Sequence, residues 1–230
     1  MKDHAASRRT RPPHYPVNLD LVDVPCLVVG GGPVARRKVL SLLESGAVVT
    51  VVAPAAIPEL RDDPRIRWHE REYRRGEAAS YRVAVAATGA NDVDTQVAND
   101  ARAAGVPVNV ADGPDDCTFT LPAVVRRGDV QITVSTAGRS PALAAWLRTR
   151  IEAAIDDAVL DLLDVLAGVR TELRDAGVPT ELPGWRRALE SGLPELVRAG
   201  RLDDARALLR AELEVDLELT PTTDLLEATR

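Results

Sequence analysis

The sequence predicts an α/β protein in which a parallel sheet is followed by a helical module. Short aliphatic runs alternate with amphipathic segments over the first half of the chain, the first run ends in three glycines at 30–32, and helical periodicity dominates after residue 140. Alternation of strand, helix and strand is typical of a doubly wound sheet. We therefore expect a Rossmann-type parallel sheet, a small β-containing middle region and a C-terminal helical module.

The expected elements of the first half follow one another at short intervals. In chain order they are strands over 21–30, 47–54, 66–70, 81–88 and 106–112, helices over 33–44 and 91–104, and two further β-rich segments at 118–121 and 130–135. The first helix ends at Gly46 and the second strand at Pro54, because glycine favours the residue after a helix and proline cannot continue a ladder. Continuous β-branched runs suit parallel strands that are covered on both faces.

Helical periodicity dominates the second half. Ser140 and Pro141 supply an N-cap and a first helical residue. The segments 141–175, 185–198 and 202–213 read as amphipathic helices, interrupted by glycine and proline between them. Their leucine stripes suit either a self-contained helical cap or an oligomer interface.

Composition fits a folded protein with an aliphatic core. Of the 230 residues, 45% are hydrophobic and only 3% aromatic, so Ala, Val and Leu must build the core. A formal net charge of −6 argues against nonspecific nucleic-acid binding. No apolar run approaches the roughly 18 residues that a membrane span needs. The two cysteines, Cys26 and Cys117, are expected as free thiols in a reducing compartment, which indicates the cytoplasm.

The glycines after the first strand form the pattern Gly30-x-Gly32-x-x-Ala35. Gly30 permits a tight turn, Gly32 lets the backbone approach a pyrophosphate, and the small Ala35 lets helix and strand pack closely. The helix N-terminus offers unpaired N–H groups and partial positive charge to phosphates. Because the glycines follow an apolar run and open an amphipathic segment, they predict dinucleotide binding rather than a glycine-rich turn in a nucleotide-free sheet.

The residues alone leave the choice between NAD and NADP open. The acid that NAD-binding units carry after the second strand is absent, since residues 52–55 read Val-Ala-Pro-Ala. Arg61 lies nearby and suits either a 2′-phosphate or a solvated loop position. Thr88, at the end of the fourth strand, is either a cofactor contact at the carboxyl edge of the sheet or a simple turn residue.

Asp112 is the candidate catalytic residue. It stands just past the fifth strand, at the edge where ligands bind in open α/β sheets, although Asp-Gly-Pro is also ordinary turn chemistry. No His, Cys or Ser constellation competes with it. His4 and His14 lie in the basic start of the chain and His69 has no partner in spacing, so no metal site is expected. No tyrosine has a lysine four residues on, which excludes the pair typical of short-chain reductases.

Ordered blocks of the sequence resemble the precorrin-2 dehydrogenase family, which includes the N-terminal part of siroheme synthases. The blocks are GGGPVARRK, GAVVTVVAP, AAT and VPVNVADGPDDCTFTLPAVVRRGDVQITVSTAGRSPALAAWLR. The resemblance covers roughly residues 15 to 155, and the helical remainder matches only in general character. It implies NAD-dependent oxidation of precorrin-2 to sirohydrochlorin. Some members also insert Fe²⁺, which is then a substrate of chelation.

The resemblance also implies roles for individual residues. Together with the glycine motif it gives these cofactor-binding residues: Gly30, Gly31, Gly32, Pro33, Val34, Pro54, Ala55 and Thr88. Members of the family likewise lack the ribose-binding acid, which favours NAD. Asp112 falls on the carboxylate implicated in dehydrogenation and chelation. A carboxylate is apt because hydride loss from the macrocycle must be accompanied by proton loss to a base.

The implied substrate is a small-molecule tetrapyrrole with many carboxylates, so its site is expected to be cationic. Arginines cluster around the family's substrate blocks, at Arg126, Arg127, Arg139, Arg148 and Arg150. Guanidinium forks bind carboxylates bidentately, although each single arginine is equally a solvated surface residue. The expected substrate-binding residues are Asn109, Ser135, Thr136, Arg139 and Ser140.

The sequence departs from the family at three points. After the Ala-Thr pair the family shows acidic residues and then an asparagine several residues on, whereas residues 88–95 read Thr-Gly-Ala-Asn-Asp-Val-Asp-Thr, which leaves the nicotinamide side undefined. Thr136-Ala137 also replaces a Ser-Gly or Thr-Gly pair. No methyltransferase region follows, so we do not expect the chain to make precorrin-2. Two alternatives remain: a non-catalytic NAD-sensing regulatory module, and a ferrochelatase or tetrapyrrole-handling protein without oxidation activity. Asp112 and the arginine-rich block argue against the sensor, which needs neither.

These expectations divide the chain into four parts. They are a disordered basic arm (1–14), an NAD-binding Rossmann domain (15–113), a β-rich dimerisation and substrate region (114–150) and a helical domain (151–230). The basic arm lacks the apolar stretch of a secretory signal. Residues 215–230 are expected to be poorly ordered. A homodimer is the expected assembly.

Overall fold

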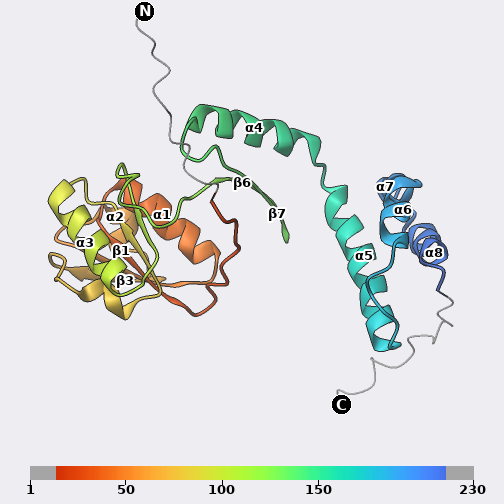
Figure 1. Ribbon diagram of the computed structural model, residues 1–230, viewed down its shortest axis with the longest axis horizontal. Coiled ribbons are helices and arrows are strands. Elements are labelled where there is room, and N and C mark those ends of the chain that lie inside the picture. Colours follow the sequence, from red (N-terminus) through yellow and green to blue (C-terminus); the bar gives the residue numbers. More distant parts are fainter. Residues whose placement is uncertain (1–13, 216–230) are drawn as a thin grey trace, which may run out of the picture. The chain divides into compact units, whose positions relative to one another are not determined.

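A computed structural model describes residues 14–215, which fall into two compact units (Figure 1). The first unit runs to Pro122 and includes residues 137–139, and the second holds residues 123–136 and those from Ser140 onward. The basic arm predicted over 1–14 and the poorly ordered stretch predicted over 215–230 lie outside the described residues, apart from His14 and Val215. Within the described range, every helix is too short or too polar to cross a membrane.

A five-stranded parallel sheet forms the centre of the first unit. Its order is β3-β2-β1-β4-β5, and its strands are β1 (Pro25–Val29), β2 (Val48–Ala53), β3 (Ile66–Glu70), β4 (Val83–Ala86) and β5 (Val108–Val110). The reversal of strand order between β1 and β4 is typical of doubly wound sheets, in which ligands bind beyond the carboxyl ends at that point. The predicted Rossmann-type sheet is confirmed.

Helices cover both faces of the sheet because both faces are apolar. On one face α1 (Pro33–Glu44) packs Ala35 and Val39 against β1 and β4. On the other, α3 (Asn91–Ala103) packs Val97 and Ala101 against β4 and β5. Two short helices that the sequence pattern did not indicate complete the unit, namely α2 (Pro58–Arg61) and a 3₁₀ turn (Glu77–Ser80).

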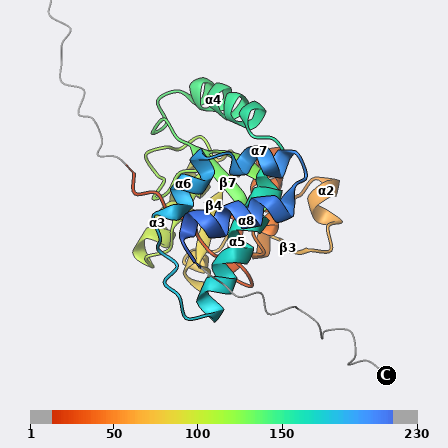
Figure 2. The ribbon, with the colours of Figure 1, turned by 90° about the vertical axis from the view of Figure 1, so that its right-hand side faces the viewer.

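The second unit begins with a two-stranded antiparallel ribbon and continues as helices. Its elements are β6 (Ala123–Arg127), β7 (Val130–Val134), α4 (Pro141–Ala154), α5 (Ala158–Asp175), α6 (Gly184–Glu190), α7 (Leu193–Arg198) and α8 (Leu202–Leu213). Helices α5 to α8 share an aliphatic core, to which α5 contributes Val165, Val169 and Leu173 from one face (Figure 2). The 3.6-residue period brings these three positions together.

The β-rich segment predicted at 118–121 is wrong, and the strand lies at 123–127 instead. Thr118 folds back onto the free edge of β5: its N–H donates to the Val108 carbonyl at 2.8 Å, and its Oγ1 accepts from the Val108 N–H at 2.7 Å. Pro122 then has no N–H to offer a ladder. The segment therefore closes the sheet edge locally instead of forming a strand of its own.

The helix predicted over 141–175 is two helices, and so is the one predicted over 185–198. The first breaks where Ile155 becomes extended and Asp156 accepts a hydrogen bond from the Arg198 Nε at 2.8 Å. The second breaks at Gly192, whose φ of +102° is left-handed. The first break thus coincides with a contact to a distant residue, and the second with the conformation of a single glycine. Helical periodicity in the sequence predicts neither.

A half-buried tyrosine fixes the connection between β3 and β4. The Tyr73 hydroxyl donates to the Asp100 carboxylate at 3.0 Å and accepts from the Ala78 N–H at 3.2 Å. The Gly76 N–H donates to the same Asp100 oxygen at 2.6 Å. Burial raises the pKa of Tyr73 to about 12.

We expect Tyr73→Phe to lower the free energy of unfolding at pH 7 by about 1–2 kcal/mol, because two polar partners lose their bond. The raised pKa means that the folded state holds the phenol proton more tightly than the unfolded state. This stabilisation is complete below pH 10 and is lost as the pH rises through about 12. Urea titrations should therefore show that the difference in free energy of unfolding between wild type and Tyr73→Phe decreases as the pH rises from 10 to about 12. Tyr15→Phe, at a position 88% exposed, serves as the control, and an equal loss there would contradict the assignment.

Candidate functional site

The glycine turn after β1 is shaped by contact with neighbouring backbone. Gly30 has a φ of +127°, and a Cβ placed on it would lie 2.3 Å from the Ala87 carbonyl oxygen after β4. A Cβ on Gly31 would lie 2.0 Å from the Ala55 carbonyl oxygen after β2. The Gly31 carbonyl also accepts from the Ile57 N–H at 2.9 Å. Positions 30 and 31 therefore require glycine, because a side chain at either one would overlap the backbone of a neighbouring segment.

Gly32 differs from its two neighbours because the space around it is open. A Cβ built on it meets no atom within 4 Å. It is the N-cap of α1 and provides no side-chain cap. The first N–H groups of the helix after Pro33 have no acceptor in a preceding turn of the helix. This arrangement fits a pyrophosphate, which needs close backbone approach and the positive end of a helix. Val34 is half-buried in the same turn, and Pro54 and Ala55 lie exposed beyond β2.

Thr88 is tied to the start of α3. Its N–H and its Oγ1 donate to the Asp94 carboxylate at 3.1 and 2.8 Å, and the Ala90 N–H donates to its hydroxyl at 3.0 Å. Asp94 is only 5% exposed. The hydroxyl thus organises the turn after β4, at the carboxyl edge of the sheet where the sequence places it. A cofactor contact for Thr88 stays a prediction.

Asp112 lies in an exposed turn directly after β5. Its φ of +63° is left-handed, a conformation that aspartate tolerates better than most residues. The turn and the N-terminal residues of α3 line a cleft of about 370 Å³. Four carboxylates line this cleft, from Asp94, Asp112, Asp115 and Asp116. The candidate catalytic group therefore faces a hollow at the edge of the sheet where α/β enzymes bind ligands.

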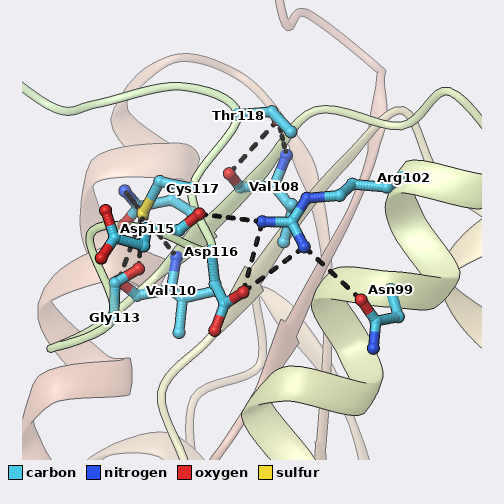
Figure 3. Close-up of polar contacts among 10 residues, drawn as sticks. Asn99, Arg102, Val108, Val110, Gly113, Asp115, Asp116, Cys117 and Thr118 are labelled. Atoms are coloured by element: carbon cyan, nitrogen blue, oxygen red, sulfur yellow. Dashed lines mark hydrogen bonds and ion pairs between the residues drawn. The ribbon is translucent and has the colours of Figure 1, made fainter. Parts of the chain in front are cut away.

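Figure 3 shows the contacts that Cys117, Arg102 and Thr118 make with the loop after β5, the loop to which Asp112 belongs. The Cys117 Sγ accepts from the Val110 N–H at 3.2 Å and donates to the Gly113 carbonyl at 3.4 Å. From α3, Arg102 donates to the Asp116 carboxylate and to the Asp115 carbonyl at 3.1–3.4 Å. With the Thr118 bonds to β5, these contacts close a compact loop. The thiol acts here as a hydrogen-bonding group.

Asn109 is buried beneath the same turn and its amide is fully engaged. It is 7% exposed; its Nδ2 donates to the Phe119 carbonyl at 3.2 Å and contacts the Cys117 Sγ at 3.5 Å. Its Oδ1 accepts from the Nζ of Lys38, on α1, at 3.2 Å. Direct substrate binding by Asn109 stays a prediction, and its contacts favour a supporting position under Asp112.

The remaining predicted substrate residues lie around the start of α4. Thr136 Oγ1 donates to the Ser140 carbonyl and accepts from the Ser140 N–H, both at 3.1 Å, and Ser140 Oγ caps the helix by accepting from the Leu143 N–H. Ser135 is exposed on the same segment. These hydroxyls shape a loop, and their substrate contacts stay predictions.

The five predicted arginines differ in the contacts that their guanidinium groups make within the protein. Arg127 and Arg148 contact the Glu152 carboxylate, Arg126 donates to Gln131, and Arg150 stacks over the Trp146 ring at 5.2 Å. Arg139 is exposed and has no polar partner anywhere within residues 14–215. Among these five, Arg139 is therefore the one whose guanidinium is best available to a carboxylate ligand.

The fold and the glycine turn define a dinucleotide-binding α/β protein. Residues 17–123 match a family described as "Putative NAD(P)-binding", and residues 127–154 match the family described as "Sirohaem biosynthesis protein central". Together these matches take in more than half of the chain. The chain belongs to the siroheme synthase N-terminal family that its sequence blocks resemble.

Relatives of known name agree with this membership. The siroheme synthase of Methylococcus capsulatus is 43% identical over 205 residues, and that of Thioalkalivibrio sulfidiphilus is 39% identical over 209. These alignments cover 86% and 89% of this chain but only 43% of each relative, so the chain spans less than half of their length. A solved structure titled "SirC, precorrin-2 dehydrogenase" shares the fold with a TM-score of 0.67 at 24% identity, covering 88% of this chain and all of that one.

Sequence reasoning missed the residues that support Asp112. Lys38 appeared only as the end of a basic helix start, Cys117 only as a free thiol, and Arg102 not at all. The pattern Asn-Val-Ala-Asp did place Asn109 and Asp112 together. Lys38 lies 71 residues from Asn109, so no local pattern reports their bond.

The three glycines allow a matched test of these contacts. Gly31→Ala should lower the free energy of unfolding by about 2–4 kcal/mol, because a methyl group there overlaps the Ala55 carbonyl. Gly32→Ala should change stability by less than about 1 kcal/mol, since its surroundings are open, yet it should weaken dinucleotide binding by filling the space for phosphate. Chemical denaturation and calorimetric titration with NAD⁺ measure the two effects. Equal destabilisation by both substitutions would refute the distinction.

Proposed function

We propose that this protein oxidises precorrin-2 to sirohydrochlorin with NAD⁺ as the hydride acceptor. The observation that carries the proposal is Asp112, held in a cleft at the same sheet edge as the glycine turn. Membership of the siroheme synthase N-terminal family supplies the substrate class. A non-catalytic NAD sensor, the alternative function, would not need a carboxylate held in so constrained a turn.

The reaction removes a hydride and a proton from neighbouring atoms of the macrocycle. Gly32 and the N-terminus of α1 would hold NAD⁺, which would supply the hydride acceptor. Asp112 takes the proton, which is a general-base step suited to an exposed carboxylate. The backbone from Val110 to Gly113, fixed by Cys117, keeps this carboxylate at a constant place in the cleft.

Charge in the cleft restricts how the substrate enters. Four carboxylates line the hollow, so a polycarboxylate must present its ring atoms there and keep its own carboxylates outside. Arg139 then suits one of those outer carboxylates, because its guanidinium is exposed and has no other ligand within the described part of the chain.

The environment of Arg61 supports NAD over NADP. This arginine was the candidate partner for a 2′-phosphate, but its Nε and one terminal nitrogen donate to the Asp62 carboxylate at 2.9 and 3.1 Å. A bidentate pair neutralises the guanidinium and occupies its fork.

A reducing compartment such as the cytoplasm suits both cysteines, which are free thiols.

Chelation of Fe²⁺ by the product is a further activity that Asp112 can serve. Metal entry releases pyrrole protons, which the same carboxylate can accept. Fe²⁺ is a substrate in that reaction and not a resident cofactor. Adding Fe²⁺ to sirohydrochlorin with and without the protein measures this activity separately from NADH formation.

Oxidation is tested with purified protein, precorrin-2 and NAD⁺ by following the absorbance of the NADH that forms. We expect Asp112→Asn to lower kcat about 10²- to 10⁴-fold, the usual contribution of a general base. Asp92→Asn, an exposed change at the start of α3, should retain the wild-type rate. Absence of NADH from the wild type would refute the activity, and full activity of Asp112→Asn would refute its role.

The dimer is proposed to form through the ribbon and α4. An isolated two-stranded ribbon is marginally stable in water, and among the strands of residues 14–215 β6 and β7 pair only with each other. Helix α4, which packs on this ribbon, exposes Leu143 by 46% and Trp146 by 55%. A second copy of the chain that covers this face would bury both side chains.

Trp146→Glu should therefore convert the dimer to a monomer, because a buried charge on the contact face is unfavourable. Leu189→Glu, which places the same charge on α6 at a side chain 40% exposed, should leave the mass unchanged. Sedimentation velocity measures both. A monomeric wild type, or a Trp146→Glu variant that stays dimeric, would contradict the proposed contact.

A further inference from the structure

We propose that Lys38 is a positioning residue for Asp112: through Asn109 it fixes the turn that carries the carboxylate, and its positive charge lies close enough to act on that carboxylate. The inference rests on the proposed function for its catalytic half. The geometric half concerns the turn alone and is testable without substrate.

The first link joins a helix to the sheet. Lys38 projects from α1, and its Nζ donates to the Asn109 Oδ1 at 3.2 Å. Asn109 is 7% exposed on β5, where an unpartnered amide oxygen would cost free energy. The Lys38 ammonium therefore fixes the orientation of the buried Asn109 amide.

The second link joins the amide to the turn. With its oxygen held by Lys38, the Asn109 Nδ2 points to the Phe119 carbonyl at 3.2 Å and the Cys117 Sγ at 3.5 Å. Cys117 in turn binds the Val110 N–H and the Gly113 carbonyl, on either side of Asp112. These contacts flank the left-handed backbone of Asp112, whose φ is +63°. Loss of the Lys38 donor should loosen the whole chain of bonds.

The third link is electrostatic. Partial burial lowers the pKa of Lys38, and the Arg37 charge lowers it further, whereas Cys117 and Asp112 raise it. Asp112 is thus close enough for its charge to act on the ammonium. Asp112 also shares its cleft with Asp94, Asp115 and Asp116, of which Asp116 is paired with Arg102. Lys38 thus places a positive charge near a turn rich in carboxylates.

A purely structural role for Lys38 makes a different prediction. A donor to Asn109 would stabilise the fold, but it would not change the pH at which the base loses activity. The test therefore needs one measurement of the turn and one of proton transfer. Lys38→Met removes the charge and the donor but keeps the stem, and Arg37→Met, an exposed neighbour on α1, removes an equal charge elsewhere.

The turn is tested by thiol labelling of the whole protein with an aromatic disulfide reagent. Cys117 is half-buried, whereas Cys26 is fully buried, so Cys117→Ser identifies the signal. We expect Lys38→Met to accelerate labelling of Cys117 about fivefold or more, the effect of losing one hydrogen bond on local opening. Arg37→Met should label at the wild-type rate. Equal rates for Lys38→Met and wild type would overturn the positioning role, whether or not the protein oxidises precorrin-2.

Proton transfer is tested by the pH profile of kcat/KM for NADH formation. A base that loses a neighbouring cation takes up a proton more readily, so in Lys38→Met the acid limb should move to higher pH by about half a pH unit or more. Lys38→Arg, which keeps the charge, should restore the wild-type limb, and Arg37→Met should not move it. An unmoved limb in a folded Lys38→Met variant would overturn the electrostatic half. An inactive wild type would refute the proposed function instead and leave the labelling result standing.

Discussion

Backbone packing at the glycine turn is the constraint on which the first unit depends. Gly30 and Gly31 lie where any side chain would overlap the carbonyl oxygens of Ala87 and Ala55. These carbonyls belong to the segments after β4 and β2, so the turn holds three strand ends together at one edge. Because the first two glycines are committed to this contact, Gly32 is left open at the N-terminus of α1. The phosphate-binding geometry follows from how the chain packs against itself.

The other half of the site is built from a loop that returns along the edge strand. After β5 the chain turns at Asp112 and comes back to bind Val108 through Thr118. Cys117 and Arg102 both bind the backbone of this loop. The two halves of the site differ in charge, since the glycine turn offers N–H groups to phosphates whereas the cleft gathers carboxylates. The proposed reaction uses both halves, the glycine turn for the cofactor and the cleft for the ring of the substrate.

The sequence shows more arginines near the predicted substrate site than the structure leaves available for binding. Five arginines around the substrate blocks suggest a cationic surface, but Arg127 and Arg148 are occupied by Glu152 and Arg150 lies over Trp146. Their carboxylate and aromatic partners lie within the same unit and serve the ribbon and α4. Composition counts charges, whereas binding depends on which of them remain unpaired.

Local patterns determined the first unit well. Apolar runs, the glycine motif and the Asn-Val-Ala-Asp block placed the five parallel strands, α1, α3 and Asp112, because each depends on neighbours in the chain. Tertiary structure alone decided the rest. The segment at 118–121 closes β5 instead of forming a strand, the long helix breaks at Asp156 where Arg198 binds, and Lys38 reaches Asn109 across 71 residues. Each of these contacts joins residues far apart in sequence, so it exists only once the chain has folded.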